Sequence, residues 1–180
     1  MFIKSRNNQR GFTVIELIIC SVIIATLTIF AAANFRGYTQ KTTITKEAER
    51  LSSIFRQAHV NTLTGHLVNG TRPAGFGVKL EECATDCSYI LFADEDGDYL
   101  YESETDIPLQ TLGMFEDNVY VDSLVPDENG LNIVFTFPKG EIYINGRQTE
   151  EEASVILKFQ NYDYTRTLTV NQNSGRIDIE

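Results

Sequence analysis

The chain is poor in the residues on which most catalytic and metal sites depend. It has only two histidines, His59 and His66, and the sequence contains neither a glycine-rich phosphate loop nor a nucleophile elbow. The acid–base groups that remain are carboxylates scattered over an acidic chain. These absences argue against an enzyme. They also argue against a zinc site, because Cys83 and Cys87 would need two further ligands at suitable spacing.

Basic residues are also scarce. The chain has 15 Lys and Arg against 25 Asp and Glu, which gives a formal net charge of −10. Residues 161–180 contain two basic and three acidic side chains. Because an acidic surface repels a phosphate backbone, we expect no nucleic-acid partner.

Charge is nearly absent from one long stretch near the N-terminus. Glu16 is the only charged residue between Phe12 and Phe35. A helix of this length extends for roughly 36 Å, enough to cross a hydrocarbon core of about 30 Å. We therefore expect residues 12–35 to form a transmembrane helix rather than a shorter, cleaved secretory signal.

The residues ahead of this stretch determine its orientation. Residues 1–11 contain Lys4, Arg6 and Arg10 and no acidic residue. The positive-inside rule keeps such a segment in the cytoplasm and places the C-terminal part across the membrane.

Glu16 is costly in a lipid-facing helix. A carboxylate near the bilayer centre raises the free energy of insertion by about 2.5–3.5 kcal/mol, so it needs a partner. If the chain is cut after Gly11, the new α-amino group of Phe12 lies four residues, about 6 Å, from Glu16. The amine of the same chain or of a neighbouring subunit would then pair with Glu16. A plain signal anchor is the alternative interpretation.

These residues resemble the signature of type IV pilins: a short basic leader that ends at Gly11, followed by Phe12, Thr13, Glu16 and Leu17 at the spacing of that family. The resemblance implies that a prepilin peptidase cleaves after Gly11 and methylates Phe12. It also implies that Glu16 meets the N-terminal amine of an adjacent subunit in a helical filament. The implied partners are other pilins or pseudopilins, the peptidase, an inner-membrane assembly platform and, before assembly, lipid. The implied location is the bacterial inner membrane with a periplasmic head, and then a pilus or pseudopilus.

Residues 36–65 are predicted to continue the helix in amphipathic form. Apolar residues recur at three- and four-residue spacing and form a stripe: Ile44, Ala48, Leu51, Phe55 and Ala58. Four charged residues of this segment are expected to lie largely off the stripe: Glu47, Glu49, Arg50 and Arg56. Gly65 suits a C-terminal cap, so the whole helix is predicted to run from Phe12 to Thr64.

Residues 66–180 are predicted to form a β-rich head. Eight segments rich in β-branched and aromatic residues read as strands: 74–80, 88–93, 118–123, 131–137, 141–145, 154–160, 165–171 and 176–179. The fold class is therefore α+β, with a long N-terminal helix packed on an antiparallel β-sheet head, as the resemblance to pilins also implies.

The order of several short motifs in the head is similar to that in GspH, FimT and FimU, a subfamily of minor pseudopilins and minor pilins. The motifs are Phe76–Leu80, Leu91–Asp98, Ile133–Phe135 with Pro138–Gly140, and Val170–Asn171 with Gly175–Ile177. The resemblance implies a minor pseudopilin near the tip of a type II secretion pseudopilus, with a role in protein export. A minor type IV pilin that primes surface pilus assembly is the alternative. A DNA-uptake pilin fits the acidic C-terminal region less well.

Asp94, Asp96 and Asp98 alternate as ligands do at positions 1, 3 and 5 of a calcium loop. The pattern then departs from that loop, because the sixth position is Tyr99 rather than Gly and the twelfth is Thr105 rather than Glu. A solvated hairpin turn is the favoured interpretation, and calcium is the alternative. We expect no other cofactor.

Cys83 and Cys87 lie close together in the exported part of the chain. An oxidising compartment favours a disulfide between them. Cys20 is interpreted as a small apolar residue of the membrane helix.

Overall fold

The computed structural model describes residues 11–84, 87–113, 115, 118–127, 130–148 and 152–180, with the backbone alone for 33–36 and 111–113. The predicted leader therefore lies outside the described residues, apart from Gly11. The chain divides into two compact units, one up to Thr39 and one from Gln40 to Glu180. Helix α1 (Val14–Thr64) contributes to both units, and each unit is described by itself.

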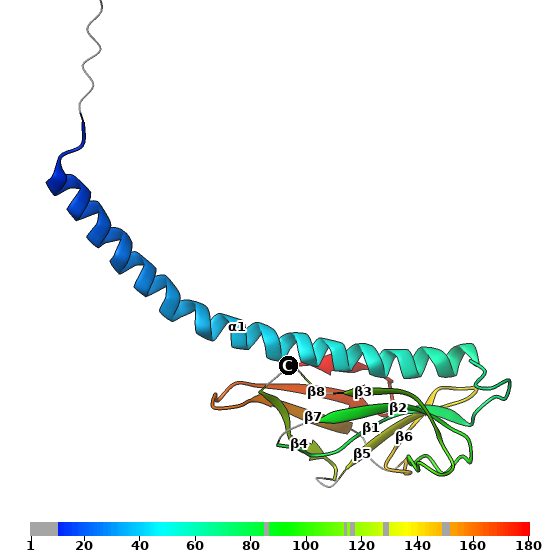
Figure 1. The fold of residues 1–180 in the computed structure, drawn as a ribbon. Helices are drawn as coiled ribbons and strands as arrows, with labels where there is room; N and C mark the ends of the chain where they lie inside the picture. Colours follow the sequence, from blue (N-terminus) through cyan, green and yellow to red (C-terminus); the bar gives the residue numbers. More distant parts are fainter. Residues whose placement is uncertain (1–10, 85–86, 114, 116–117, 128–129, 149–151) are drawn as a thin grey trace, which may run out of the picture. The chain divides into compact units, whose positions relative to one another are not determined.

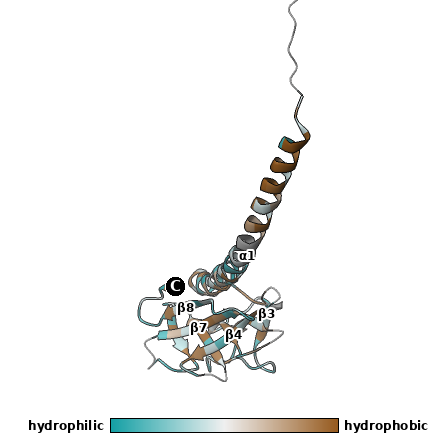
Figure 2. Ribbon diagram, turned by 90° about the vertical axis from the view of Figure 1, so that its left-hand side faces the viewer, coloured by the Kyte–Doolittle hydropathy of each residue, from teal (hydrophilic) through white to brown (hydrophobic). Residues whose placement is uncertain are grey.

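The first unit consists of the N-terminal half of α1, which Figure 2 colours hydrophobic over most of its length. It is long and apolar enough to cross a membrane, and none of its apolar stretch is buried against other described residues of the chain. The helix begins at Val14 rather than at the predicted Phe12, and Phe12 and Thr13 precede it.

In the second unit, the part of α1 from Gln40 to Thr64 lies along the β-sheets (Figure 1). The predicted stripe is confirmed, because all five of its side chains are fully buried: Ile44, Ala48, Leu51, Phe55 and Ala58. The prediction for Glu47 was wrong, since this side chain is only 1% exposed. Glu47 lies three residues after Ile44 and four before Leu51, so the helical repeat places it on the stripe. Its carboxylate lies 3.7 Å from the Arg50 guanidinium.

In the described part of the chain, nine antiparallel strands make two sheets. The five-stranded sheet has the order β3-β2-β1-β5-β6, with β1 Gly75–Leu80, β2 Ser88–Asp94, β3 Ile107–Gly113, β5 Leu131–Thr136 and β6 Glu141–Ile144. The four-stranded sheet has the order β4-β7-β8-β9, with β4 Val119–Val125, β7 Glu152–Phe159, β8 Thr165–Asn171 and β9 Ile177–Ile179. The predicted α+β arrangement, a long helix on antiparallel β-structure, is confirmed.

Strand β3 was not among the predicted strands. It contains Pro108, which has no amide hydrogen to donate to a sheet and so lowers the strand signal. The strand lies at the edge of its sheet, where a proline is tolerated.

The core lies between the packed half of α1 and the inner faces of the sheets. Alternate residues of β5 (Leu131, Ile133 and Phe135) are fully buried there, together with apolar side chains from the other sheet. The Thr62 hydroxyl donates hydrogen bonds to the carbonyls of Ala58, 3.0 Å away, and Phe135, 2.9 Å away. This second bond joins the last turns of α1 to β5 of the five-stranded sheet.

The opposite face of that sheet carries a second, smaller layer. Phe92, Gly77, Val134 and Tyr143 lie side by side across four strands, so their side chains share one face. A Cβ atom on Gly77 would lie 2.6 Å from the Phe92 ring, so this position has room only for glycine. The Tyr101 ring, from the loop between β2 and β3, lies 5.1 Å from the Phe92 ring, measured between ring centroids.

Candidate functional site: the apolar half of the N-terminal helix

Thr13 forms the N-terminal cap of α1. Its side-chain oxygen accepts a hydrogen bond from the Glu16 amide at 3.3 Å, and its carbonyl accepts one from the Leu17 amide at 3.2 Å. This role was missed in the sequence, although Thr13-x-x-Glu16 before an apolar run is a capping-box signal. The cap fixes the first turn of the helix directly beside the predicted cleavage position.

The side chains that follow present apolar surface in every direction. Phe12 is 81% exposed. The large apolar residues along the next turns are each more than half exposed: Val14, Ile15, Leu17, Ile18, Ile19, Val22, Ile23, Ile24, Leu27, Ile29 and Phe30. A helix that is hydrophobic all round is stable only inside lipid or among other apolar surfaces. The chain itself supplies no such surface within the residues that the structure describes.

The hydroxyl groups of this segment are already satisfied. Ser21, Thr26 and Thr28 donate hydrogen bonds of 2.7–2.9 Å to the carbonyls of Ile18, Ile23 and Ile24, respectively. Such bonds to the preceding turn remove the need for water, so these polar residues can enter an apolar environment at low cost.

Glu16 differs from these hydroxyls. Among the described residues, no side chain pairs with its carboxylate, and the cap uses only its backbone amide. It is thus the one ionisable group of the apolar segment apart from the thiol of Cys20, which is free and exposed. The arrangement can attract one complementary cation from outside the chain and little else.

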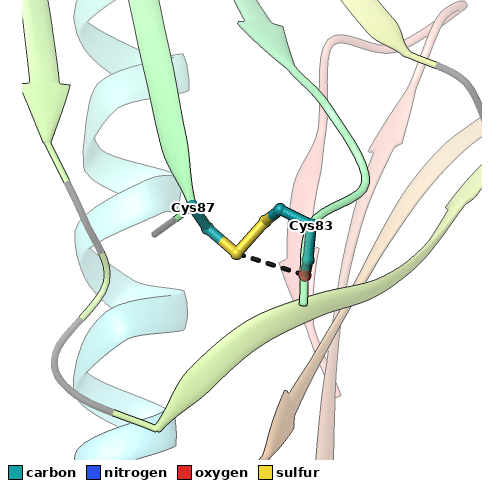
Figure 3. Close-up of a disulfide and its surroundings, with 2 residues drawn as sticks. All are labelled: Cys83 and Cys87. Carbon is teal, nitrogen blue, oxygen red and sulfur yellow. Dashed lines mark hydrogen bonds between the residues drawn. A yellow bond between two sulfur atoms is a disulfide. The ribbon is translucent and has the colours of Figure 1, made fainter. Parts of the chain in front are cut away.

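In the head, the structure joins Cys83 and Cys87 by a disulfide, with their Cα atoms 5.4 Å apart (Figure 3). Cys83 follows β1 and Cys87 precedes β2, so the bond closes the connection between these strands. The dashed line in Figure 3 joins the Cys87 sulfur to the Cys83 carbonyl at 3.2 Å. It marks a close contact, because an oxidised sulfur has no proton to donate. Cys83 also forms a β-bridge with Val121 of β4, in the other sheet.

The acidic residues singled out in the sequence lie at the end of β2 and in the loop that leads to β3. Carboxylate oxygens of Asp94, Asp96 and Asp106 lie within 4.8 Å of one another, as do those of Asp96, Asp98 and Glu102. Burial raises the pKa of Asp94 to about 6; the Gly97 amide opposes this rise, and the Asp106 and Asp96 carboxylates add to it. In the sequence, Glu102 and Asp106 belong to the same acidic run as Asp94, but Asp106 lies one residue beyond the last position of the calcium-loop pattern, so that pattern does not include it.

Comparison with known proteins bears on the apolar segment alone. Residues 6–32 match the family model described as the prokaryotic N-terminal methylation motif. No curated protein and no solved structure matches the chain. The matched segment contains Gly11, Phe12 and Glu16, and it supports a type IV pilin-like protein. The motif implies processing by a prepilin peptidase and assembly with other pilins, and the apolar helix fits a membrane-anchored pilin of structural rather than enzymatic character.

Proposed function

We propose that this protein is a minor pseudopilin of the GspH type, a structural subunit near the tip of a type II secretion pseudopilus. It is stored in the inner membrane with residues 1–11 in the cytoplasm and the head, residues 66–180, in the periplasm. Cleavage after Gly11 and methylation of Phe12 then release the mature chain for assembly.

The observation that carries the proposal is the isolation of Glu16 in an apolar helix half whose apolar stretch is not buried by any other described residue of the chain. In a bundle of such helices, a charged pair is poorly screened, so the attraction between Glu16 and a neighbour's Phe12 amine is far stronger than in water. On assembly, the apolar helix exchanges contacts with lipid for contacts with other apolar helices, which differ little in polarity. The ion pair then favours one axial position of the subunit relative to its neighbour. In a plain signal anchor, the Glu16 carboxylate would have no neighbouring amine with which to pair.

The charges of the C-terminal region support a protein partner over DNA. Arg166 donates a hydrogen bond to Thr45 at 3.2 Å and lies over the Tyr164 ring. Arg176 donates a hydrogen bond to the Asp178 carboxylate. With both arginines engaged on an acidic chain, a phosphate backbone finds few cations.

Mass spectrometry of two cell fractions tests the proposal. Sheared surface filaments and the remaining envelope are separated, and the N-terminus and abundance of this chain are measured in each. We expect a peptide that begins at methylated Phe12, confined to the envelope fraction. A chain that still begins at Met1 everywhere would overturn the pilin-like role. Mature chain found in sheared fibres, at a small fraction of another pilin, would replace the pseudopilin with a FimT- or FimU-like minor pilin.

A further inference from the structure

The loop between β2 and β3, residues 95–106, is held against the outer face of the five-stranded sheet. Its Tyr101 ring packs on Phe92, and the Tyr101 amide donates a hydrogen bond to the Asn132 side chain at 3.2 Å. The Tyr99 ring stacks on Tyr143 of β6, with 3.8 Å between ring centroids. These contacts fix the loop on three strands, so the carboxylates that it carries are held in place rather than free in solvent.

Four carboxylates of this loop and that of Asp94, the last residue of β2, gather without a compensating cation among the described residues. Asp96 belongs to both groups of three in which carboxylate oxygens lie within 4.8 Å: Asp94, Asp96 and Asp106, and Asp96, Asp98 and Glu102. Among the residues that the structure describes, no Lys, Arg or His forms an ion pair with any of the five. Mutual repulsion of this kind is relieved by a bound cation.

Asp94 gives an independent sign that a ligand is missing. Its side chain is 0% exposed, and its Oδ2 atom is buried without a hydrogen-bond partner, while Oδ1 accepts a bond of 2.7 Å from the Gly97 amide. A buried carboxylate oxygen left without a partner raises the free energy of the folded state. By contrast, both oxygens of Asp106, which is 5% exposed, accept backbone amides, those of Glu95 and Glu102. Asp106 is therefore held firmly beside Asp94, and the unsatisfied oxygen belongs to Asp94.

The backbone of the loop resolves both departures from the calcium-loop pattern. At the sixth position Tyr99 has φ = +66°, the left-handed conformation for which that position usually needs glycine. At the far end, Asp106 supplies the carboxylate that Thr105 lacks, from one residue further along the chain. The Asp98 amide donates a hydrogen bond to the Asp96 carboxylate, and the Leu100 amide donates one to the Asp98 carboxylate. The backbone of the loop therefore turns tightly beside its acidic side chains.

We propose that this loop binds one calcium ion, with Asp94, Asp96 and Asp106 as its side-chain ligands and with Asp98 and Glu102 completing the negative charge around it. The donor set consists of oxygen atoms alone, which suits calcium and magnesium and excludes the softer metals. Calcium is the better fit, since it accepts six to eight oxygens in irregular geometry, whereas magnesium demands a near-ideal octahedron. The ion fastens the β2–β3 connection, and this role does not depend on which filament the subunit joins.

Calcium titration of the full-length chain in detergent micelles, after treatment with EDTA, tests this site. We expect one calcium per chain by isothermal titration calorimetry, with a dissociation constant of about 10⁻⁵ to 10⁻³ M. We also expect a higher melting temperature with calcium by circular dichroism, and a smaller rise with magnesium. A folded wild-type chain that releases no heat and shows no shift in melting temperature would overturn the proposal.

Two matched variants locate the ion. Asp96 is exposed, so Asp96→Asn should fold normally and weaken calcium binding at least about tenfold, because it removes the ligand common to both groups. Glu104→Gln is the control, since Glu104 is an exposed residue of the same loop, carries the same charge and belongs to neither group. Equal calcium affinity in the two variants would mean that calcium merely accumulates on an acidic surface, and would refute the site.

Terbium gives a second readout that requires no change in stability. The chain has no tryptophan, so terbium luminescence excited through aromatic side chains depends on its tyrosines, two of which, Tyr99 and Tyr101, lie in this loop. We expect sensitised emission that calcium displaces in the wild type and in Glu104→Gln, and that is lost in Asp106→Asn. Emission that persists in Asp106→Asn would place the ion elsewhere.

Discussion

The two halves of α1 have the same secondary structure and opposite surroundings. From Val14 to Ala32 the large apolar side chains are exposed on all sides, whereas from Gln40 onward one face of the helix is buried on the sheets and the opposite face is exposed. A fully buried Leu, Ile or Phe contributes about 1.5–3 kcal/mol of transfer free energy. The second half gains this free energy from its own head, and the first half gains it only from lipid or from other helices. Substitutions in the first half should therefore change incorporation into filaments, whereas substitutions in the second half should change the free energy of unfolding of the head.

The largest effect is expected at Glu16. Glu16→Leu should leave membrane insertion intact and reduce incorporation into filaments at least about tenfold, because removing one partner of a buried ion pair costs about 3–5 kcal/mol. The amount of chain in isolated filaments, relative to the membrane fraction, measures this effect. Glu49→Leu is the matched control, since Glu49 is an exposed carboxylate of the packed half. Normal incorporation of Glu16→Leu would refute the ion pair.

The next test compares one apolar residue from each half. Phe55→Ala should lower the free energy of unfolding of the head by about 3–5 kcal/mol, because Phe55 is fully buried and its loss leaves a cavity. Ile23→Ala should leave that free energy unchanged, since Ile23 is exposed and belongs to the other compact unit. Denaturant unfolding of the full-length chain in detergent measures both. Equal effects of the two substitutions would contradict the division into two units.

The disulfide should affect the head alone. Replacing Cys83 and Cys87 together by Ser should lower the free energy of unfolding by roughly 2 kcal/mol, at the low end of the usual range because the closed loop is short. Melting curves recorded with and without reductant measure this change. The double variant should be insensitive to the reductant, and Cys20→Ser should melt like the wild type. A wild type that reductant leaves unchanged would show that the bond adds nothing to stability.

The smallest expected effect is a pH dependence at His59, on the packed half of α1. Burial lowers the pKa of His59 below its ordinary value of 6.5. Its ring stacks on Phe135, 4.8 Å between centroids, and faces a cavity also lined by Lys139 and Glu141. Because the folded state favours the neutral ring, the unfolded chain binds the proton more tightly, and stability falls as the pH decreases below 6.5.

The His59 contribution is isolated by a difference between variants. His59→Gln should flatten the decrease in melting temperature between neutral and mildly acidic pH, relative to the wild type. His66→Gln, which removes the other, exposed histidine, should not. The comparison between variants is needed because Asp94, with its raised pKa, acts in the opposite direction over part of the same range. Parallel pH profiles of wild type and His59→Gln would contradict this prediction.

Most of the fold could be predicted because its signals are local. The absence of charge defines the first half of α1, the repeat of apolar residues defines the second, and β-branched segments mark eight of the nine strands. Strand β3 was missed because its sequence, with Pro108, depends on a place at the sheet edge, and that place is decided by tertiary packing. The burial of Glu47 was also missed, because charged residues were expected on the exposed face of the helix. The spacing of three residues from Ile44 and four from Leu51 instead places Glu47 on the face that packs on the head.

The acidic loop was less predictable for a different reason. The spacing of Asp94, Asp96 and Asp98 is local, but the partnership of Asp94 with Asp106 depends on how the chain folds back before β3. The left-handed conformation of Tyr99 is likewise not indicated by its residue type, and its ring stacks on Tyr143, from a strand distant in the sequence. A sequence motif that tests only residue identity at each position cannot register a glycine-like backbone at a tyrosine.

The end of α1 has a mechanical consequence. The helix stops at Thr64, and Gly65, with φ = +62°, turns the chain back toward the sheets along which the packed half lies. A force applied along the helix axis therefore acts on the whole buried stripe and on the Thr62 bond to Phe135 at the same time, in shear. Contacts loaded together in this way resist sliding as a group, whereas contacts loaded one after another would peel apart singly.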